Sequence, residues 1–212
     1  MRADVYFSLD VEADGPIPGP YSMVSVGLAV AGRSDGVFAA ADPTADTFYR
    51  ELRPISDDFV PEALAVSGLD RAALLRDGAD PATAMGELSD WVTRTAGAGR
   101  PVIVAYPAVF DWMFLYWYLL RFTGASVFGH SGCLDIKTLY AVRAGVPIGA
   151  AVKGRMPAHL LSKRRHTHHA LDDAVEQAEL FANLMAWPGP QQGPRQGPQQ
   201  GAQIDSPGSR RA

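Results

Sequence analysis

The sequence predicts an α/β fold, in which helices pack on a central β-sheet. Three segments in the first quarter of the chain have the pattern of β-strands, at residues 5–12, 23–30 and 48–52. From residue 80 onward, helical patterns alternate with a further strand. This order of elements favours an α/β sheet over a helical bundle or a β-sandwich.

The first strand carries two acidic residues on one face. Apolar and polar residues alternate across residues 5–12, which is the period of a β-strand. Because successive side chains of a strand point to opposite faces, Asp10 and Glu12 project from the same face. A turn rich in Pro and Gly separates this strand from the second one, at residues 23–30, and the third strand follows at residues 48–52.

Helices are predicted in the second half of the chain. Asp80 and Pro81 mark a helix start, with an acidic N-cap and a proline at the first helical position. A fourth, buried strand at residues 102–105 precedes a helix at residues 110–122. The last helix covers residues 171–185, where apolar residues recur on one side.

Residues 101–120 are nearly all apolar and about as long as a membrane span. Asp111 lies near the centre of this stretch, and an unpaired carboxylate there is costly in lipid. Pro107 separates a β-branched run from an aromatic run with helical spacing. We therefore predict a buried strand followed by a core helix, and no membrane span.

The composition is that of one globular domain with a polar tail. The chain has 212 residues, of which 47% are hydrophobic, and this is enough for one sizeable core. From residue 188 the composition changes to Pro, Gly and Gln, and such a segment cannot bury enough apolar surface to order itself. We predict a folded domain at residues 1–187 and a disordered tail at residues 188–212.

Charge and cysteine content exclude two protein classes. Nineteen basic and 23 acidic residues give a formal charge of −4, so any contact with phosphate needs a local basic patch. A single cysteine, Cys133, excludes a disulfide framework. The first residues contain no apolar signal segment, and we expect a cytoplasmic protein.

Four acidic residues lie at strand ends and helix starts: Asp10, Glu12, Asp111 and Asp173. Asp111 and Asp173, taken singly, are typical first-turn acids that interact with the helix dipole. Their apolar neighbours predict burial, and several buried carboxylates are costly unless cations neutralise them. Oxygen ligands of this kind suit Mg²⁺ or Mn²⁺, and two such ions can assist phosphoryl transfer.

A run of cations, imidazoles and acids, residues 163–173, comes directly before the last helix. A histidine beside a metal site can accept a proton near neutral pH. Lys163, Arg164 and Arg165 could hold a phosphate backbone although the whole protein is acidic. A solvated loop is an equally good interpretation of these three cations.

Three motifs, in order along the chain, resemble those of the DEDDh class of 3′–5′ exonucleases, which includes ribonuclease T, oligoribonuclease and the proofreading subunit of bacterial replicative polymerase. They are Asp-Val-Glu at residues 10–12, Phe-Asp at residues 110–111, and residues 168–174, in which His168 stands five residues before Asp173. Residues 59–69 and 133–139 also resemble segments of the class. The resemblance therefore covers about residues 3–186.

The resemblance implies a ribonuclease-H-like domain with a mixed sheet of about five strands flanked by helices. It implies an enzyme that hydrolyses phosphodiester bonds at the 3′ end of single-stranded RNA or DNA and releases nucleoside monophosphates. Asp10, Glu12, Asp111 and Asp173 would hold two Mg²⁺ or Mn²⁺ ions. His168 would be the general base.

Two segments depart from the pattern of the class. Residues 13–16 read Ala-Asp-Gly-Pro, where members often have Thr-Thr-Gly or similar. Residues 105–109 lack the Asn that usually precedes the Phe-Asp pair. Both departures concern the positioning of the substrate, because every acidic position is filled.

Aromatic residues fall into two groups. The helical spacing of one group favours core positions over base stacking: Trp112, Phe114, Tyr116, Trp117 and Tyr118. Tyr106 and Phe110 lie near the carboxylates and are the better candidates for stacking on substrate bases.

Two alternatives remain open. A zinc site would draw on one cysteine and four histidines, without the paired ligands of structural zinc: Cys133, His130, His166, His168 and His169. A non-catalytic ribonuclease-H-like module that binds nucleic acid or protein is the second, and the complete acidic set argues against it. The residues do not decide between RNA and DNA, and they leave the oligomeric state unknown.

Overall fold

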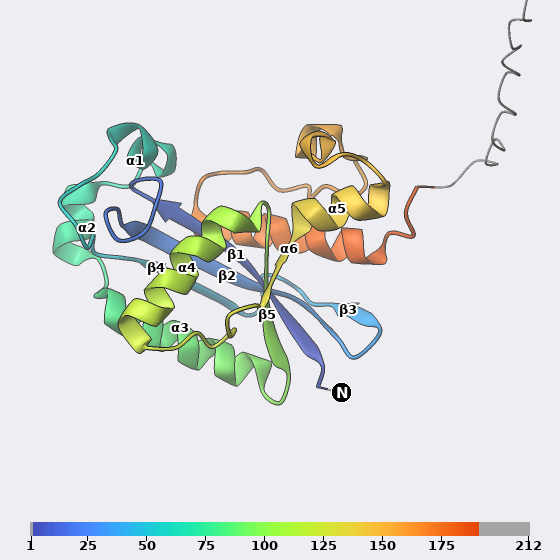
Figure 1. The fold of residues 1–212 in the computed structure, drawn as a ribbon, viewed down its shortest axis with the longest axis horizontal. Coiled ribbons are helices and arrows are strands. Elements are labelled where there is room, and N and C mark those ends of the chain that lie inside the picture. The colour runs from blue at the N-terminus through green and yellow to red at the C-terminus, as the bar shows by residue number, and fades with distance from the viewer. Residues whose placement is uncertain (1, 191–212) are drawn as a thin grey trace, which may run out of the picture.

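A six-stranded sheet crosses the middle of the molecule, with β1 at its centre (Figure 1). The computed structural model describes residues 2–190. The strand order is β3-β2-β1-β5-β6, and β4 also pairs with β2. β1 is antiparallel to β2 and parallel to β5, so the sheet is mixed, as predicted.

The four predicted strands are present with small shifts at their ends. Two further strands, β3 and β6, have three residues each, too few for alternation to reveal them. The strands are β1 Asp4–Ala13, β2 Met23–Ser34, β3 Phe38–Ala40, β4 Thr47–Glu51, β5 Arg100–Ala105 and β6 Cys133–Asp135.

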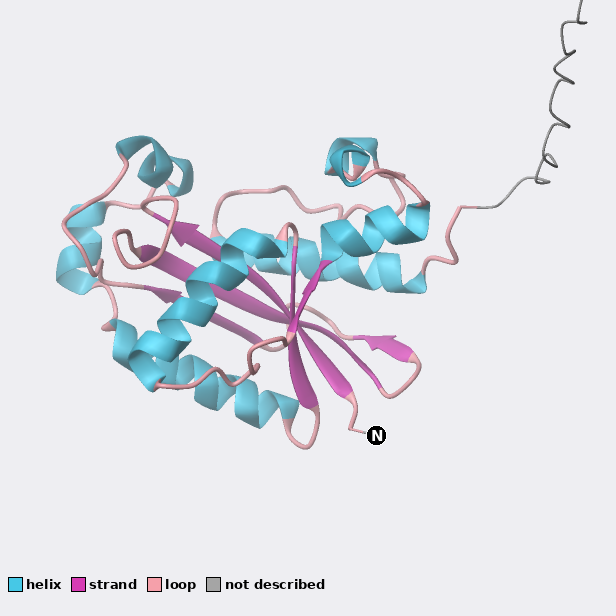
Figure 2. Ribbon diagram, in the orientation of Figure 1, coloured by secondary structure: helices cyan, strands magenta, loops and turns pink. Residues whose placement is uncertain are grey.

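The three predicted helices are also confirmed, as α3, α4 and α6. Asp80 is the N-cap of α3, and its side chain accepts a hydrogen bond from the backbone of Thr83. Shorter helices surround them (Figure 2). The helices are α1 Pro61–Ser67, α2 Arg71–Asp77, α3 Pro81–Ala96, α4 Ala108–Thr123, α5 Ile136–Ala144 and α6 Ala170–Ala186, with 3₁₀ turns at Ile148–Ala150 and Lys153–Arg155.

Both faces of β1 are buried. Val5, Phe7 and Leu9 pack into the core that α3 and α4 share with one face of the sheet. Tyr6 packs with α5 and α6 on the other face, where Asp10 and Glu12 also lie. The alternation predicted for β1 is therefore correct, and its polar face is covered by α6 instead of water.

The apolar stretch at residues 101–120 divides between β5 and α4, as predicted. Phe114 and Tyr118 are fully buried, and Trp112 and Trp117 are partly buried against the same core. Tyr116 is partly buried and stacks on the Trp112 ring instead. Among the described residues, no helix combines the length and the apolar character that crossing a membrane would require.

α6, the last described helix, ends at Ala186, one residue before the predicted domain boundary. The predicted tail begins at residue 188, and its residues 191–212 lie outside the described part of the chain. The division into a domain at 1–187 and a tail at 188–212 stays a prediction.

Candidate active site

Three carboxylates meet where β1 ends and α6 begins. Asp10, Glu12 and Asp173 each place a carboxylate oxygen within 4.8 Å of the others. Asp10 and Glu12 are buried on the face of β1 that α6 covers, and Asp173 is 0% exposed in the first turn of α6. Residues separated by more than 160 positions thus form one acidic site.

Asp111, the fourth predicted acid, lies beside this group of three but is not part of it. β5 is parallel to β1 and ends at Ala105, so α4 begins beside the end of β1 and places Asp111 in its first turn. The Asp111 carboxylate accepts a hydrogen bond of 3.0 Å from the backbone N–H of Val11. Val11 lies between Asp10 and Glu12, so this bond holds Asp111 against the strand that carries the other two acids.

Gly27 lets α6 approach the sheet. It lies opposite Asp10 in the register of β1 and β2. A Cβ atom at this position would stand 2.3 Å from the backbone carbon of Ala170, the first residue of α6. Only glycine fits this contact, which brings Asp173 down to the level of Asp10.

Burial and mutual repulsion raise the pKa values of these acids. Burial raises the pKa of Glu12 to about 7, with further contributions from Asp173 and Asp111. Burial likewise raises the pKa of Asp111 to about 7. The pKa of Asp10 is raised well above its usual range by burial and by the charges of Asp111 and Glu12. Cations bound at this site would relieve the cost of ionising the carboxylates.

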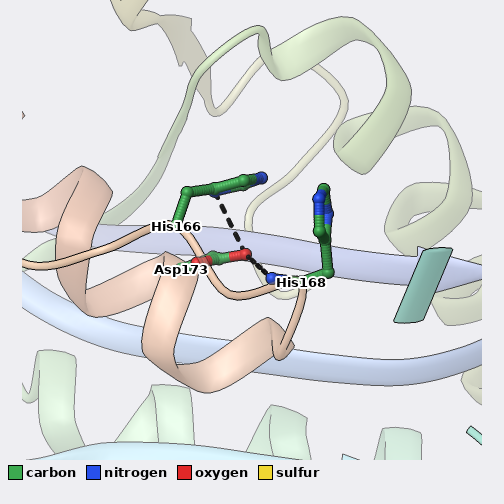
Figure 3. A group of neighbouring side chains, drawn as sticks. All are labelled: His166, His168 and Asp173. Atoms are coloured by element: carbon green, nitrogen blue, oxygen red, sulfur yellow. Dashed lines mark hydrogen bonds and ion pairs between the residues drawn. The ribbon is translucent and has the colours of Figure 1, made fainter. Parts of the chain in front are cut away.

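His168 lies on the loop that leads into α6. Its φ of 58° is in the left-handed region, where residues other than glycine are uncommon. The backbone N–H groups of Thr167 and His168 donate hydrogen bonds of 2.8 Å to the two oxygens of Asp173. These bonds hold the strained turn, and the same carboxylate that lines the site thereby positions His168 (Figure 3).

The neighbouring histidines have different surroundings. His169 is the N-cap of α6, and its ring stacks on Tyr49 with centroids 4.5 Å apart. The His166 side chain is 47% exposed, and its Nδ1 lies 3.1 Å from an oxygen of Asp173. The turn at His168 brings the His166 ring back over this carboxylate (Figure 3).

No family model matches the chain. A curated protein of Escherichia coli, the 3′–5′ DNA exonuclease Cap18, is 35% identical to it over 184 residues, which cover 85% of this chain and 92% of that protein. The chain belongs to the DEDDh class of 3′–5′ exonucleases. As an exonuclease of this class, it depends on divalent metal ions and acts on nucleic acid.

Solved structures share the ribonuclease-H-like fold. A 3′-exonuclease that recognises the 3′ end of the histone mRNA stem-loop has a TM-score of 0.64 and 12% identity, over 87% of this chain and 63% of that one. The nuclease domain of 3′hExo, a DEDDh family member bound to rAMP, has a TM-score of 0.62 and 10% identity, over 87% of this chain and 92% of that one. E. coli Exonuclease I in complex with a dT13 oligonucleotide has a TM-score of 0.58 and 15% identity, over 87% of this chain and 41% of that one. At these identities the likeness shows the fold, and the relationship to Cap18 favours an enzyme over the non-catalytic module.

The two aromatic residues predicted to contact substrate, Tyr106 and Phe110, lie near the acidic residues. Phe110 is exposed in the first turn of α4, one position before Asp111. Tyr106 is partly buried, and its hydroxyl donates a hydrogen bond to the backbone oxygen of Ala151. Phe110 therefore has more freedom to stack on a base than Tyr106.

The basic run follows the outside of α6. Lys163, Arg164 and Arg165 are all exposed. Arg164 donates a hydrogen bond of 2.8 Å to Glu179, a residue of α6. Both Arg164 and Arg165 line a cleft of about 430 Å³ beside the start of α6. Arg164 is thus paired with α6, whereas the side chains of Lys163 and Arg165 make no hydrogen bond or ion pair with the described residues.

The five residues of the alternative zinc site are not brought together. Within residues 2–190, neither Cys133 nor His130 belongs to a group of three or more side chains that could share one ion. Burial raises the pKa of the Cys133 thiol to about 12, which disfavours the thiolate that zinc requires.

The first departure from the motifs of the class has a structural role. Asp14 is fully buried, accepts a hydrogen bond of 2.6 Å from the backbone of Ser22, and lies 3.5 Å from Arg71. Its backbone oxygen accepts a hydrogen bond from Val60. Asp14 thus fastens the segment at residues 59–69 beside the end of β1 and does not itself face the site.

Gln177 is a residue that motif analysis misses. It is buried one helical turn after Asp173, and its amide nitrogen donates a hydrogen bond of 2.8 Å to Asp10. Its amide oxygen accepts a hydrogen bond from the backbone N–H of Tyr106. Because that backbone group can only donate, the amide cannot turn round, and a donor always faces Asp10. Helical spacing from Asp173 was the only sequence signal for this contact.

Lys153 was also missed. It pairs with Glu176 of α6 and lies over the Tyr106 ring, 5.4 Å from its centroid. Its charge opposes the rise in the pKa of Asp10. A single lysine in a 3₁₀ turn has no pattern that would single it out.

Glu12→Gln should stabilise the metal-free protein at about pH 8 and change it little at about pH 4. Folding raises the pKa of Glu12 from 4.5 to about 7, so the folded protein binds more protons than the unfolded chain between these values. Stability therefore falls as the pH rises through this window, and a neutral glutamine removes the loss. Thermal unfolding in EDTA measures the gain in stability. Each kcal/mol gained should raise the unfolding midpoint by about 2–4 °C. Equal unfolding midpoints of the wild type and Glu12→Gln at about pH 8 would show that the ionised Glu12 does not destabilise the fold.

Gln177→Met should weaken Mn²⁺ binding by about 10–100-fold, because the variant keeps the side-chain volume but frees Asp10 from its hydrogen bond. Titration of the metal-free protein with Mn²⁺ measures the change. Asn183→Leu is the matched control, since Asn183 lies on the same helix and donates a hydrogen bond of 3.2 Å to the distant Leu160. An equal loss of affinity in the two variants would point to a general disturbance of α6.

Proposed function

We propose that this exonuclease degrades DNA from a free single-stranded 3′ end and releases nucleoside monophosphates. The observation that carries the proposal is the buried acidic site of Asp10, Glu12 and Asp173, with His168 at its rim. DNA is the substrate named for Cap18, the relative at 35% identity. A cytoplasmic location stays a prediction.

The donor set suits Mg²⁺ or Mn²⁺. Asp10, Glu12 and Asp173 offer carboxylate oxygens that lie within 4.8 Å of one another. Asp111 is held against Val11, between Asp10 and Glu12 in sequence, and its charge acts on Asp10. Hard cations prefer such oxygen ligands, and four acids can carry the charge of two divalent ions. Bound there, the ions would stabilise negative charge on the attacking and leaving oxygens of the phosphodiester.

His168 is the proposed general base. A His168 nitrogen lies within 4.8 Å of an Asp173 oxygen, which supports this role. From there the imidazole would accept the proton of the attacking water. Asp173 would then have two roles, because it lines the metal site and also fixes the backbone turn of the base. Phe110 is placed to stack on a base near the 3′ end, with Tyr106 as a more restrained second candidate.

Hydrolysis of labelled oligonucleotides tests the function. Single-stranded DNA with a 5′ label is expected to shorten stepwise from its 3′ end with Mg²⁺ or Mn²⁺ and to stay intact in EDTA. RNA of the same sequence serves as the comparison, and faster loss of RNA would overturn the choice of DNA. A circular strand and a strand with a 3′-phosphate should resist, whereas their equal degradation would indicate an endonuclease.

Replacing both Lys163 and Arg165 with alanine should raise KM more than it lowers kcat. Cations that contact phosphates release counterions, so the variant should also lower the slope of log K against log salt by about 0.7 per lost contact. Binding of single-stranded DNA at several salt concentrations measures this. Arg94→Ala is the control, because Arg94 is exposed on α3, across the sheet from α6. An unchanged salt slope in the double variant would show that Lys163 and Arg165 do not contact phosphate.

A further inference from the structure

We propose that His166, His168 and Asp173 form a second metal site, which binds Zn²⁺ and thereby inhibits the exonuclease. The three side chains come from one loop and the first turn of α6. The acidic site uses Asp173 as well, so the two metal sites overlap at this residue.

The geometry brings three metal-binding atoms together. One atom each from His166, His168 and Asp173 lies within 4.8 Å of the other two. His166 Nδ1 is 3.1 Å from Asp173 Oδ2, a spacing that two ligands of one small ion can have. The two imidazole rings have centroids 4.5 Å apart, and both stand beside the carboxylate (Figure 3).

The ligand types favour zinc over Mg²⁺. Two imidazole nitrogens and one carboxylate oxygen form a three-ligand set typical of zinc sites that keep a fourth position open. Imidazole nitrogen suits Zn²⁺, whereas Mg²⁺ prefers oxygen ligands. Asp10 and Glu12 offer only oxygen ligands. We therefore expect Zn²⁺ at the histidine-containing site and Mg²⁺ at the acidic site.

The site needs little rearrangement to form. Asp173 is fully buried, and the backbone N–H groups of Thr167 and His168 hold its carboxylate in place. The side chain of His166 is 47% exposed, so its ring can adjust and an ion can reach it from solvent. One ligand is therefore fixed, and only the two rings must be oriented.

Inhibition follows from the ligand that the zinc site shares with the reaction, and this step rests on the proposed function. An imidazole whose lone pair is donated to zinc cannot accept a proton. Zinc at this site would therefore remove His168 as a base and engage Asp173. His166 has no role in the proposed hydrolysis, so it separates zinc binding from catalysis.

Zinc binding is measured first, without any activity assay. The metal-free full-length protein is titrated with Zn²⁺ against a chromophoric chelator, in excess Mg²⁺. Loss of a second-shell partner costs about 10–100-fold in affinity, so His166→Ala, which removes a direct ligand, should weaken zinc binding by roughly 100-fold. His130→Ala is the control, because His130 is exposed and belongs neither to the His166–His168–Asp173 group nor to the Asp10–Glu12–Asp173 group. Glu12→Gln should retain zinc binding.

The outcomes separate the two sites. If Glu12→Gln loses zinc and His166→Ala keeps it, zinc occupies the acidic site and the proposal is wrong. In the hydrolysis assay, Zn²⁺ should inhibit the wild type in excess Mg²⁺, and His166→Ala should require a correspondingly higher zinc concentration; equal sensitivity would overturn the inhibitory role. If the wild type binds zinc through His166 but degrades no nucleic acid, the zinc site stands and the proposed function fails.

Discussion

Asp10→Asn and Asp173→Asn are each expected to lower kcat by roughly 10³-fold or more. Loss of a partner outside the first coordination shell already costs about 10–100-fold, and both residues are proposed direct ligands. Asparagine keeps the size of the side chain but removes the negative charge that attracts divalent cations. The loss should therefore persist when Mg²⁺ is raised to saturation for the wild type.

The measurement is kcat on single-stranded DNA at several Mg²⁺ concentrations, together with thermal unfolding. Asp172→Asn is the matched control, because Asp172 shares the first turn of α6 with Asp173 but has an exposed side chain. We expect this control to retain activity. The fold should survive in Asp10→Asn, since the substitution removes repulsion from Asp111 and Glu12. Full activity of Asp10→Asn, or of the wild type in excess EDTA, would refute the metal site.

His168→Asn is expected to lower kcat by about 10²–10⁴-fold, the usual contribution of a general base. Asparagine is chosen because it tolerates the left-handed conformation that His168 adopts, so the turn before α6 should stay intact. Mn²⁺ affinity should change little, which distinguishes the loss of a base from the loss of a metal ligand.

Two single variants test which histidine acts. His166→Ala and His169→Ala should lose much less activity than His168→Asn, because His169 caps α6 and stacks on Tyr49. The comparison is kcat on the same single-stranded DNA for the wild type and the three variants. If His169→Ala lost as much activity as His168→Asn, His169 would have to replace His168 as the proposed general base.

The sequence by itself determined the class of fold and the identity of the acidic set. The period of two in β1 puts Asp10 and Glu12 on one face, and that face is where the structure has them. The starts of α4 and α6 place Asp111 and Asp173 in first turns, as their positions next to apolar helical patterns predict. These features depend on neighbours a few residues apart, so local patterns carry them.

Only the tertiary structure decided what surrounds those acids. Gln177 reaches Asp10 across 167 positions of sequence, and Gly27 is needed because α6 crosses β2 at that point. The contact between His166 and Asp173 depends on a single left-handed residue, His168. The strands β3 and β6 form only because longer strands offer them partners. Each of these features arises from contacts made when distant segments pack together, and such contacts leave no periodic trace in the chain.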